Sequence, residues 1–173
     1  MAKKIFIDPV SCIGCRACEV ACEREHDGFS YITVYDVEEA DLSIPYTCRH
    51  CENAPCVAVC PTKALHWSRG GVVVDIVKCI GCRLCEIACP FGIPIYVASL
   101  KSVIKCDLCN HRLAKGLPIA CASTCPTDAI FFGEEEEFIE WKRSQVLSRI
   151  SKASLESLVL KASAIKPVGS EQR

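Results

Sequence analysis

The sequence predicts an α+β fold in which short helices and short strands surround metal-binding loops and a longer helix follows at the C-terminus. Three observations lead to this prediction. Sixteen of the 173 residues are cysteine, and they fall into four groups of four. The segments between these groups have room only for short helices and strands. Metal sites therefore replace much of the hydrophobic core that such small units lack.

Each element follows from a local residue pattern. Residues 31–37 are β-branched and aromatic, which favours a strand, and Gly70 with Gly71 supplies the turn of a hairpin formed by 64–67 and 72–75. The other strands are expected at residues 4–8, 95–97, 103–104 and 129–132. Short helices are expected at residues 16–25, 54–59, 84–88, 107–113 and 122–124.

Composition and charge exclude several classes of protein. Half of the residues are apolar and 24% are charged, which is typical of a folded chain. With 20 basic and 21 acidic side chains the formal charge is -1, so no electrostatic footprint for nucleic acid is present. No apolar run is long enough for a transmembrane segment, and the first residues do not resemble a secretion signal. We therefore expect a cytoplasmic protein whose thiols stay reduced.

The spacing of the cysteines identifies the metal centre. Two quartets have the spacing C-x2-C-x2-C-x3-C, and they are Cys12, Cys15, Cys18 and Cys22, then Cys79, Cys82, Cys85 and Cys89. Two quartets lengthen the gap before the third cysteine, and they are Cys48, Cys51, Cys56 and Cys60, then Cys106, Cys109, Cys121 and Cys125. No cysteine is left over.

The short spacing matches the run that binds [4Fe–4S] clusters in bacterial ferredoxins. Structural zinc sites instead use cysteine pairs separated by a longer segment, and disulfides need an oxidising compartment. Iron–sulfur ligation is therefore favoured over zinc and over disulfides. In two-cluster ferredoxins the fourth cysteine ligates the other cluster, so we expect pairs of quartets to exchange their fourth thiols.

An internal repeat supports this interpretation. Residues 12–22 and 79–89 are identical at nine of eleven positions, at an offset of 67 residues. Ile13 and Ile80 occupy equivalent positions between the thiols, and we expect them to keep water away from the cluster sulfur. The histidines, which are His26, His50, His66 and His111, are scattered along the chain and are not expected to be ligands.

The complete pattern resembles the four-cluster, ferredoxin-type iron–sulfur subunits of modular redox enzymes. The resemblance is carried by residues 48–64, by residues 105–109 and by residues 116–126, and it covers about residues 3–133. Such subunits accompany molybdenum or tungsten oxidoreductases, which include formate dehydrogenases, dimethyl sulfoxide reductases and aldehyde oxidoreductases. They also accompany carbon monoxide dehydrogenases and hydrogenases.

The resemblance implies four [4Fe–4S] clusters with crossed ligand sets. Two outer sets would be Cys12, Cys15, Cys18 with Cys125, and Cys106, Cys109, Cys121 with Cys22. Two inner sets would be Cys48, Cys51, Cys56 with Cys89, and Cys79, Cys82, Cys85 with Cys60.

Two intertwined ferredoxin-like units follow from these sets, each binding two clusters. Residues 1–47 together with 101–133 would form the outer unit, and residues 48–100 the inner unit. A helix over 134–165 and a tail over 166–173 would complete the chain.

The expected function is relay of single electrons through four clusters between a catalytic oxidoreductase subunit and another redox partner. Nucleotide-binding loops and nucleophile motifs are absent from the sequence, so we expect no substrate site of its own. A place in anaerobic metabolism is what the resemblance implies. A freely diffusing polyferredoxin and a zinc-stabilised interaction module are the alternatives.

Apolar residues recur at helical spacing through 138–165. This segment could pack on its own core, dock a partner or second copy, or lie on a membrane surface.

Overall fold

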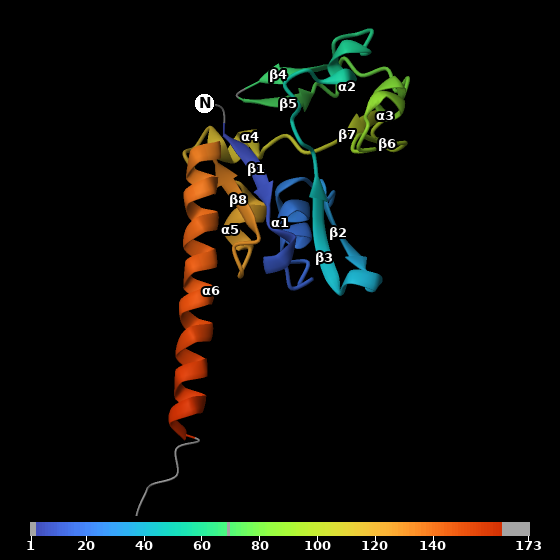
Figure 1. Cartoon of the computed structure of the whole chain (residues 1–173). Coiled ribbons are helices and arrows are strands. Elements are labelled where there is room, and N and C mark those ends of the chain that lie inside the picture. The colour runs from blue at the N-terminus through green and yellow to red at the C-terminus, as the bar shows by residue number, and fades with distance from the viewer. Residues whose placement is uncertain (1–2, 69, 164–173) are drawn as a thin grey trace, which may run out of the picture. The chain divides into compact units, whose positions relative to one another are not determined.

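The computed structural model describes residues 3–68 and 70–163, shown as a ribbon in Figure 1. Its contacts divide the chain into two compact units, one that ends at Glu134 and one that begins at Glu135. The first unit contains all sixteen cysteines, and the described part of the second is one helix.

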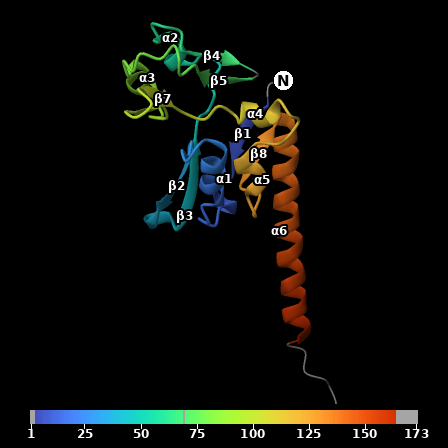
Figure 2. The ribbon, with the colours of Figure 1, turned by 180° about the vertical axis from the view of Figure 1, so that it is seen from behind.

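The first unit contains four small antiparallel sheets of two strands each. The pairs are β1 (Lys4–Ile7) with β8 (Ile130–Gly133), β2 (Ile32–Val37) with β3 (Leu42–Thr47), β4 (Leu65–Ser68) with β5 (Gly71–Val74), and β6 (Ile95–Val97) with β7 (Ser102–Ile104). The β1–β8 pair places Lys4 opposite Gly133 and so joins the start of this unit to its end. Figures 1 and 2 both show these two strands side by side.

Short helices lie between the sheets. They are α1 (Ala17–Glu25), α2 (Pro55–Ala58), α3 (Leu84–Ala88), α4 (Asn110–Leu113) and α5 (Ala120–Thr124), with 3₁₀ turns at Pro9–Ser11 and Glu38–Ala40. Each of α1, α3 and α5 carries at least one buried cysteine, and α1 packs against α5. The helices therefore position thiols rather than a broad apolar face.

The element predictions from the sequence are confirmed except at β3, which was missed. The segment Leu42–Thr47 contains Pro45, which lacks the N–H group that a central strand needs. In a sheet of two strands each strand has a free edge, so proline is tolerated there. The strand is fixed by its pairing with β2, which places Pro45 opposite Val34.

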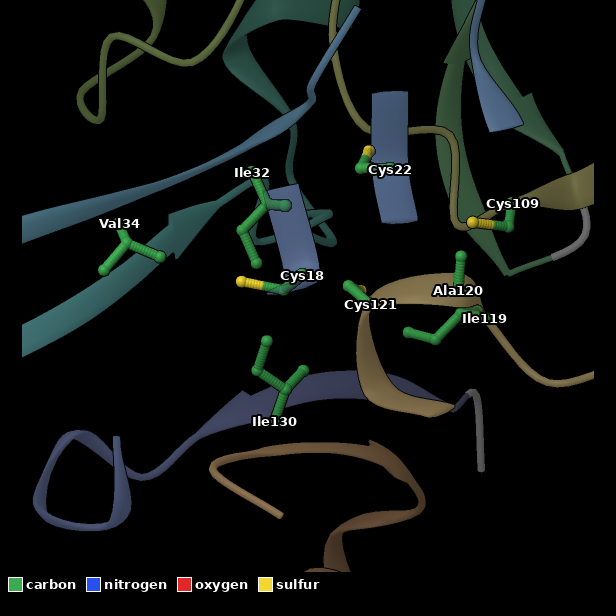
Figure 3. Packing of buried hydrophobic residues seen from close by; sticks show 9 residues of the cluster. All are labelled: Cys18, Cys22, Ile32, Val34, Cys109, Ile119, Ala120, Cys121 and Ile130. Atoms are coloured by element: carbon green, nitrogen blue, oxygen red, sulfur yellow. The ribbon is translucent and has the colours of Figure 1, made fainter. Parts of the chain in front are cut away.

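The buried residues form two clusters, each built partly from cysteine. The first cluster, drawn in Figure 3, contains Cys18, Cys22, Ile32, Val34, Cys109, Ile119, Ala120, Cys121 and Ile130. The second contains Ala54, Cys56, Leu65, Val72, Cys85 and Val103. Thiols thus occupy positions that aliphatic side chains hold in an ordinary core.

The second unit is helix α6 (Glu135–Ser163). Its first turn carries Glu135, Glu136 and Glu137, where negative charge complements the helix dipole. Among the described residues no helix is long and apolar enough to cross a membrane. Residues 164–165 of the expected helix and the expected tail over 166–173 lie outside the described residues.

Candidate metal centres

The sixteen cysteines are all free thiols, and most are partly or fully buried. Only Cys15 and Cys82, the equivalent second cysteines of the two short quartets, are exposed. The buried thiols are Cys18, Cys22, Cys56, Cys85, Cys106, Cys109 and Cys121. This distribution gives each quartet thiols that face inward and thiols that lie near the surface.

The two short quartets share one backbone conformation. Gly14 and Gly81 have φ of 67° and 68°, and Arg16 and Arg83 have φ of 57° and 62°, all in the left-handed region. A Cβ at Gly14 would lie 2.6 Å from the Ser43 hydroxyl, so the loop needs glycine for space as well as for conformation. The sequence repeat is therefore also a structural repeat.

Two cavities each bring together three thiols of one quartet and the fourth thiol of another. The first is lined by Cys48, Cys51, Cys56 and Cys89, together with His50, Lys105 and apolar residues. The second is lined by Cys60, Cys79, Cys82 and Cys85, with Thr62, Arg83 and apolar residues.

A further group of thiols surrounds Cys121. Burial raises the pKa of the Cys121 thiol well above its ordinary value, and repulsion from Cys106, Cys109 and Cys22 adds to the rise. Cys18 in turn lies close enough to Cys125 for the second thiol to raise the pKa of the first. For Cys12 and Cys15 the ligand assignment rests on the sequence.

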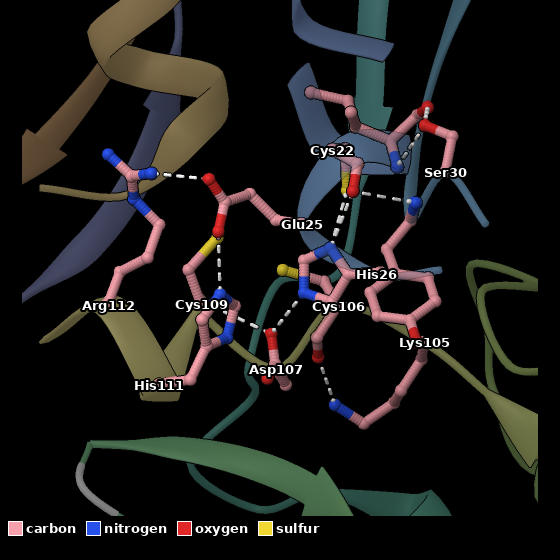
Figure 4. A network of polar contacts seen from close by, with 12 residues as sticks. Cys22, Glu25, His26, Ser30, Lys105, Cys106, Asp107, Cys109, His111 and Arg112 are labelled. Carbon is pink, nitrogen blue, oxygen red and sulfur yellow. Dashed lines mark hydrogen bonds and ion pairs between the residues drawn. The ribbon is translucent and has the colours of Figure 1, made fainter. Parts of the chain in front are cut away.

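Polar side chains support the thiols near Cys22 (Figure 4). Nδ1 of His26 lies 2.7 Å from the carbonyl oxygen of Cys22 and 3.5 Å from its Sγ, and Nε2 lies 3.1 Å from Oδ1 of Asp107. The same carboxylate oxygen accepts the N–H of Cys109 at 2.8 Å. Burial lowers the pKa of His26, but the bonds to Asp107 and Cys22 outweigh it and raise the pKa to about 10.

Helices α1 and α4 are joined by a second network in the same view. Glu25 accepts bonds from Arg112 Nη1 at 2.5 Å and from His111 Nε2 at 2.8 Å. Arg112 also donates from Nε to the carbonyl of Pro118 at 2.8 Å. These contacts fix the long segment between Cys109 and Cys121, so the extended gap of this quartet does not separate its thiols.

The two equivalent isoleucines lie beside the thiols, as their place in the sequence indicated. Ile80 lines the cavity of Cys60, Cys79, Cys82 and Cys85, and Ile13 lies next to Cys12 in a surface hollow. Each residue is 65% exposed. That they keep water away from a bound cluster stays a prediction.

Comparison with known proteins identifies the family. A model described as a 4Fe-4S dicluster domain matches residues 40–135, and one described as a 4Fe-4S binding domain matches residues 10–25. The thiosulfate reductase electron transfer subunit PhsB of Salmonella typhi is 43% identical over 149 residues, which cover 78% of each protein. The chain belongs to the 4Fe-4S dicluster family of iron–sulfur electron-transfer subunits.

Two other relatives are also named as oxidoreductases or their subunits. The B subunit of polysulfide reductase from Wolinella succinogenes is 40% identical over 78% of each protein. Putative oxidoreductase UacF of Escherichia coli is 36% identical over 99% of this chain, but the chain spans only 28% of that protein. A solved structure, the active site complex BamBC of benzoyl coenzyme A reductase, aligns over 91% of this chain and 96% of that one. The two structures share 19% sequence identity, with a TM-score of 0.41.

The residues around the first of the two cavities fit a [4Fe–4S] cluster. His50 lines the cavity of Cys48, Cys51, Cys56 and Cys89, and its buried Nε2 has no hydrogen-bond partner among the described residues. Because Nδ1 of His50 accepts the N–H of Val72 at 3.0 Å, Nε2 carries the proton. A sulfur acceptor in the cavity would satisfy this donor.

Hydrogen bonds to sulfur are present at the second cavity, which Cys60 lines. Burial opposes ionisation of Cys60, but N–H groups of Leu65, Thr62 and Ala64 and the Thr62 hydroxyl together hold its pKa below the ordinary value. The Thr62 hydroxyl lies 3.8 Å from the thiol, and Thr127 lies at the same distance from Cys125. Such donors tune the potential of a bound cluster.

At four of the buried thiols the effect of burial outweighs that of the hydrogen bonds. It raises the pKa of Cys18, Cys85 and Cys109 to about 11 and that of Cys106 to about 12. These groups would remain protonated at neutral pH without a cation, so iron supplies the charge that makes thiolate stable there.

Sequence reasoning missed three polar residues that support the thiols: His26, His50 and Asp107. One signal was available, because Asp107 directly follows Cys106 and His26 follows Cys22 by four residues. Nothing in the sequence placed His50 against β5.

Proposed function

We propose that this chain relays single electrons through four [4Fe–4S] clusters between the catalytic subunit of a reductase complex and a second redox partner. When bound, such clusters accept and release one electron at a time. The observation that supports the proposal most directly is the cavity lined by Cys48, Cys51 and Cys56 with Cys89 from the following quartet. A single zinc ion would not need thiols exchanged between quartets.

The proposed ligand sets are the crossed ones. Two of them, Cys48, Cys51, Cys56 with Cys89 and Cys79, Cys82, Cys85 with Cys60, are supported by the two cavities. The set of Cys106, Cys109, Cys121 with Cys22 is supported by mutual repulsion among these thiols. The set of Cys12, Cys15, Cys18 with Cys125 is supported by the proximity of its last two members.

The division into an outer unit, 1–47 with 101–133, and an inner unit, 48–100, is part of the same proposal. Its support is the composition of the two buried clusters. One draws on residues between Cys18 and Val34 and between Cys109 and Ile130, and the other on residues between Ala54 and Val103.

The catalytic partner is proposed to be a molybdenum or tungsten reductase. Support comes from relatives named as electron-transfer or B subunits of thiosulfate, polysulfide and dimethyl sulfoxide reductases. These names lend no support to a carbon monoxide dehydrogenase or hydrogenase. We propose that the chain has no substrate site of its own. A cytoplasmic setting is proposed because all sixteen thiols are free.

Native mass spectrometry of the protein purified without oxygen from its own source tests this function. We expect the chain mass to rise by four clusters, within an assembly that includes a larger catalytic subunit. Four clusters on a lone chain would instead favour the diffusible polyferredoxin. A mass that fits a few zinc ions, without visible absorbance that dithionite bleaches, would overturn the proposal.

A further inference from the structure

Lys105 has an unusual environment for a lysine. The residue is 4% exposed and lies between β7 and Cys106. Its Nζ donates to the carbonyl oxygens of Val72 and, at 2.7 Å, of Cys106, and lies 3.7 Å from Sγ of Cys48. Figure 4 shows the bond to Cys106. The ammonium is thus held in one place by groups from three separate segments.

Neutral carbonyls do not compensate a buried positive charge. No carboxylate in the described part of the chain forms an ion pair with Lys105. An uncompensated buried ammonium is costly, so the fold requires negative charge nearby. The neighbouring thiols supply that charge when they hold iron as thiolates.

The thiols around Lys105 come from two different proposed ligand sets. Cys48 and Cys56 belong to the set with Cys51 and Cys89, and Cys106 belongs to the set with Cys22. Lys105 lines the cavity of the first set, where its Nζ lies 3.7 Å from Sγ of Cys48, and the same Nζ donates to the carbonyl oxygen of Cys106 in the second set. Cys48 and Cys106 also lie near enough to repel each other electrostatically. The ammonium therefore acts on both sets.

His50, which lies beside Lys105, does not add a second positive charge. Because Nδ1 of His50 accepts the N–H of Val72 at 3.0 Å, that nitrogen carries no proton and the imidazole is neutral. Lys105 is therefore the buried cation at this point between the two thiol groups.

We propose that Lys105 is a positioning residue shared by two clusters, the one held by Cys48, Cys51, Cys56 and Cys89 and the one held by Cys22, Cys106, Cys109 and Cys121. Its charge favours the more negative, reduced state of each, which raises both reduction potentials where the outer and inner units meet. The inference rests on the proposed ligand sets.

The test is a potentiometric titration of the full-length, cluster-loaded protein, in which electron paramagnetic resonance reports the reduction of each cluster. Lys105→Gln keeps a hydrogen-bond donor and removes the charge. We expect two of the midpoint potentials to fall by at least about 59 mV, which corresponds to a tenfold decrease in the equilibrium constant for one-electron reduction. Lys105→Arg, which keeps the charge, should change them less.

Lys115→Gln is the matched control, because Lys115 is exposed and its loss removes the same formal charge. Unchanged midpoints in Lys105→Gln, or a shift confined to one cluster, would overturn the inference. Iron and sulfide analysis of the unaltered protein separates this failure from failure of the proposed function, which predicts four clusters whatever the potentials.

A second measurement needs no substitution. It tests the position of Lys105 even if the Lys105→Gln variant does not bind its clusters. Protein grown with lysine labelled with ¹⁵N at Nζ alone is reduced and studied by pulsed electron paramagnetic resonance. We expect ¹⁵N coupling in the signals of two clusters. Absence of coupling, or coupling to one cluster only, would overturn the shared position of Lys105.

Discussion

In the proposed ligand sets, individual cysteines determine which quartets share a cluster. Cys22 ends the first quartet in sequence, yet its charge acts on Cys121 of the fourth quartet. The resemblance to ferredoxin-type subunits implied this pairing, although the two thiols are 99 positions apart in the sequence.

Replacing Cys22 by serine tests the crossed arrangement. We expect Cys22→Ser to lose the cluster held by Cys106, Cys109 and Cys121, because a thiolate ligand is removed from that set. Its electron paramagnetic resonance spectrum and iron content should then match those of Cys106→Ser. A match to Cys12→Ser would show instead that Cys22 serves its own quartet.

One histidine supports the thiols in a way that its place in the sequence did not indicate. His26 was not expected to be a ligand, because the histidines are scattered along the chain. In the structure its ring bridges Cys22 and Asp107, and Asp107 in turn holds the N–H of Cys109. These residues support the ligands through hydrogen bonds, a role that leaves no spacing signature in sequence.

At the scale of elements, the sequence repeat has a structural counterpart in two glutamates. Glu19 of α1 accepts the backbone N–H of Val34 in β2. Glu86 of α3 accepts the backbone N–H of Tyr96 in β6, at 2.6 Å. Each glutamate therefore ties the helix after its cysteine loop to a strand.

Truncating Glu19 tests this tie. Glu19→Ala leaves the N–H of Val34 without its acceptor, and an unsatisfied N–H at this partly buried position costs about 1–3 kcal/mol. We expect the loaded protein to lose its visible absorbance at a lower temperature. Glu23→Ala, which removes an exposed glutamate from the same helix, is the control. Equal melting of the two variants would contradict the role of Glu19.

For the first unit as a whole, thiols occupy much of the interior. Four of the nine residues in one buried cluster and two of the six in the other are cysteines. Aliphatic packing alone is therefore small, and in the proposed ligand sets iron joins segments that are distant in sequence.

Removing iron should unfold this unit. We expect anaerobic chelation after oxidation of the clusters to abolish the β-sheet signal in circular dichroism and to expose residues 3–134 to protease. The untreated, loaded protein is the reference. Retention of the sheet signal in iron-free protein would show that the apolar residues suffice.

No function has been assigned to the second unit, helix α6. If α6 docks the catalytic subunit, deletion of residues 138–173 should weaken co-purification while the iron content per chain stays unchanged. A truncated chain that binds its partner as well as the full chain does would reject docking, and loss of iron would indicate that the helix supports the first unit.

The sequence alone determined the features that depend on local spacing. Cysteine intervals specify the type of metal centre, and residue patterns specify all the short helices and every strand except β3. These features arise within a few residues, where backbone geometry and side-chain chemistry act directly.

Only the tertiary structure decided which distant polar groups meet around the thiols. His26 meets Asp107, and Lys105 reaches both Cys48 and Val72. β3 likewise forms because β2 supplies the partner that its proline-containing sequence does not indicate. Such proximity is set by the packing of several elements at once, so no single stretch of sequence encodes it.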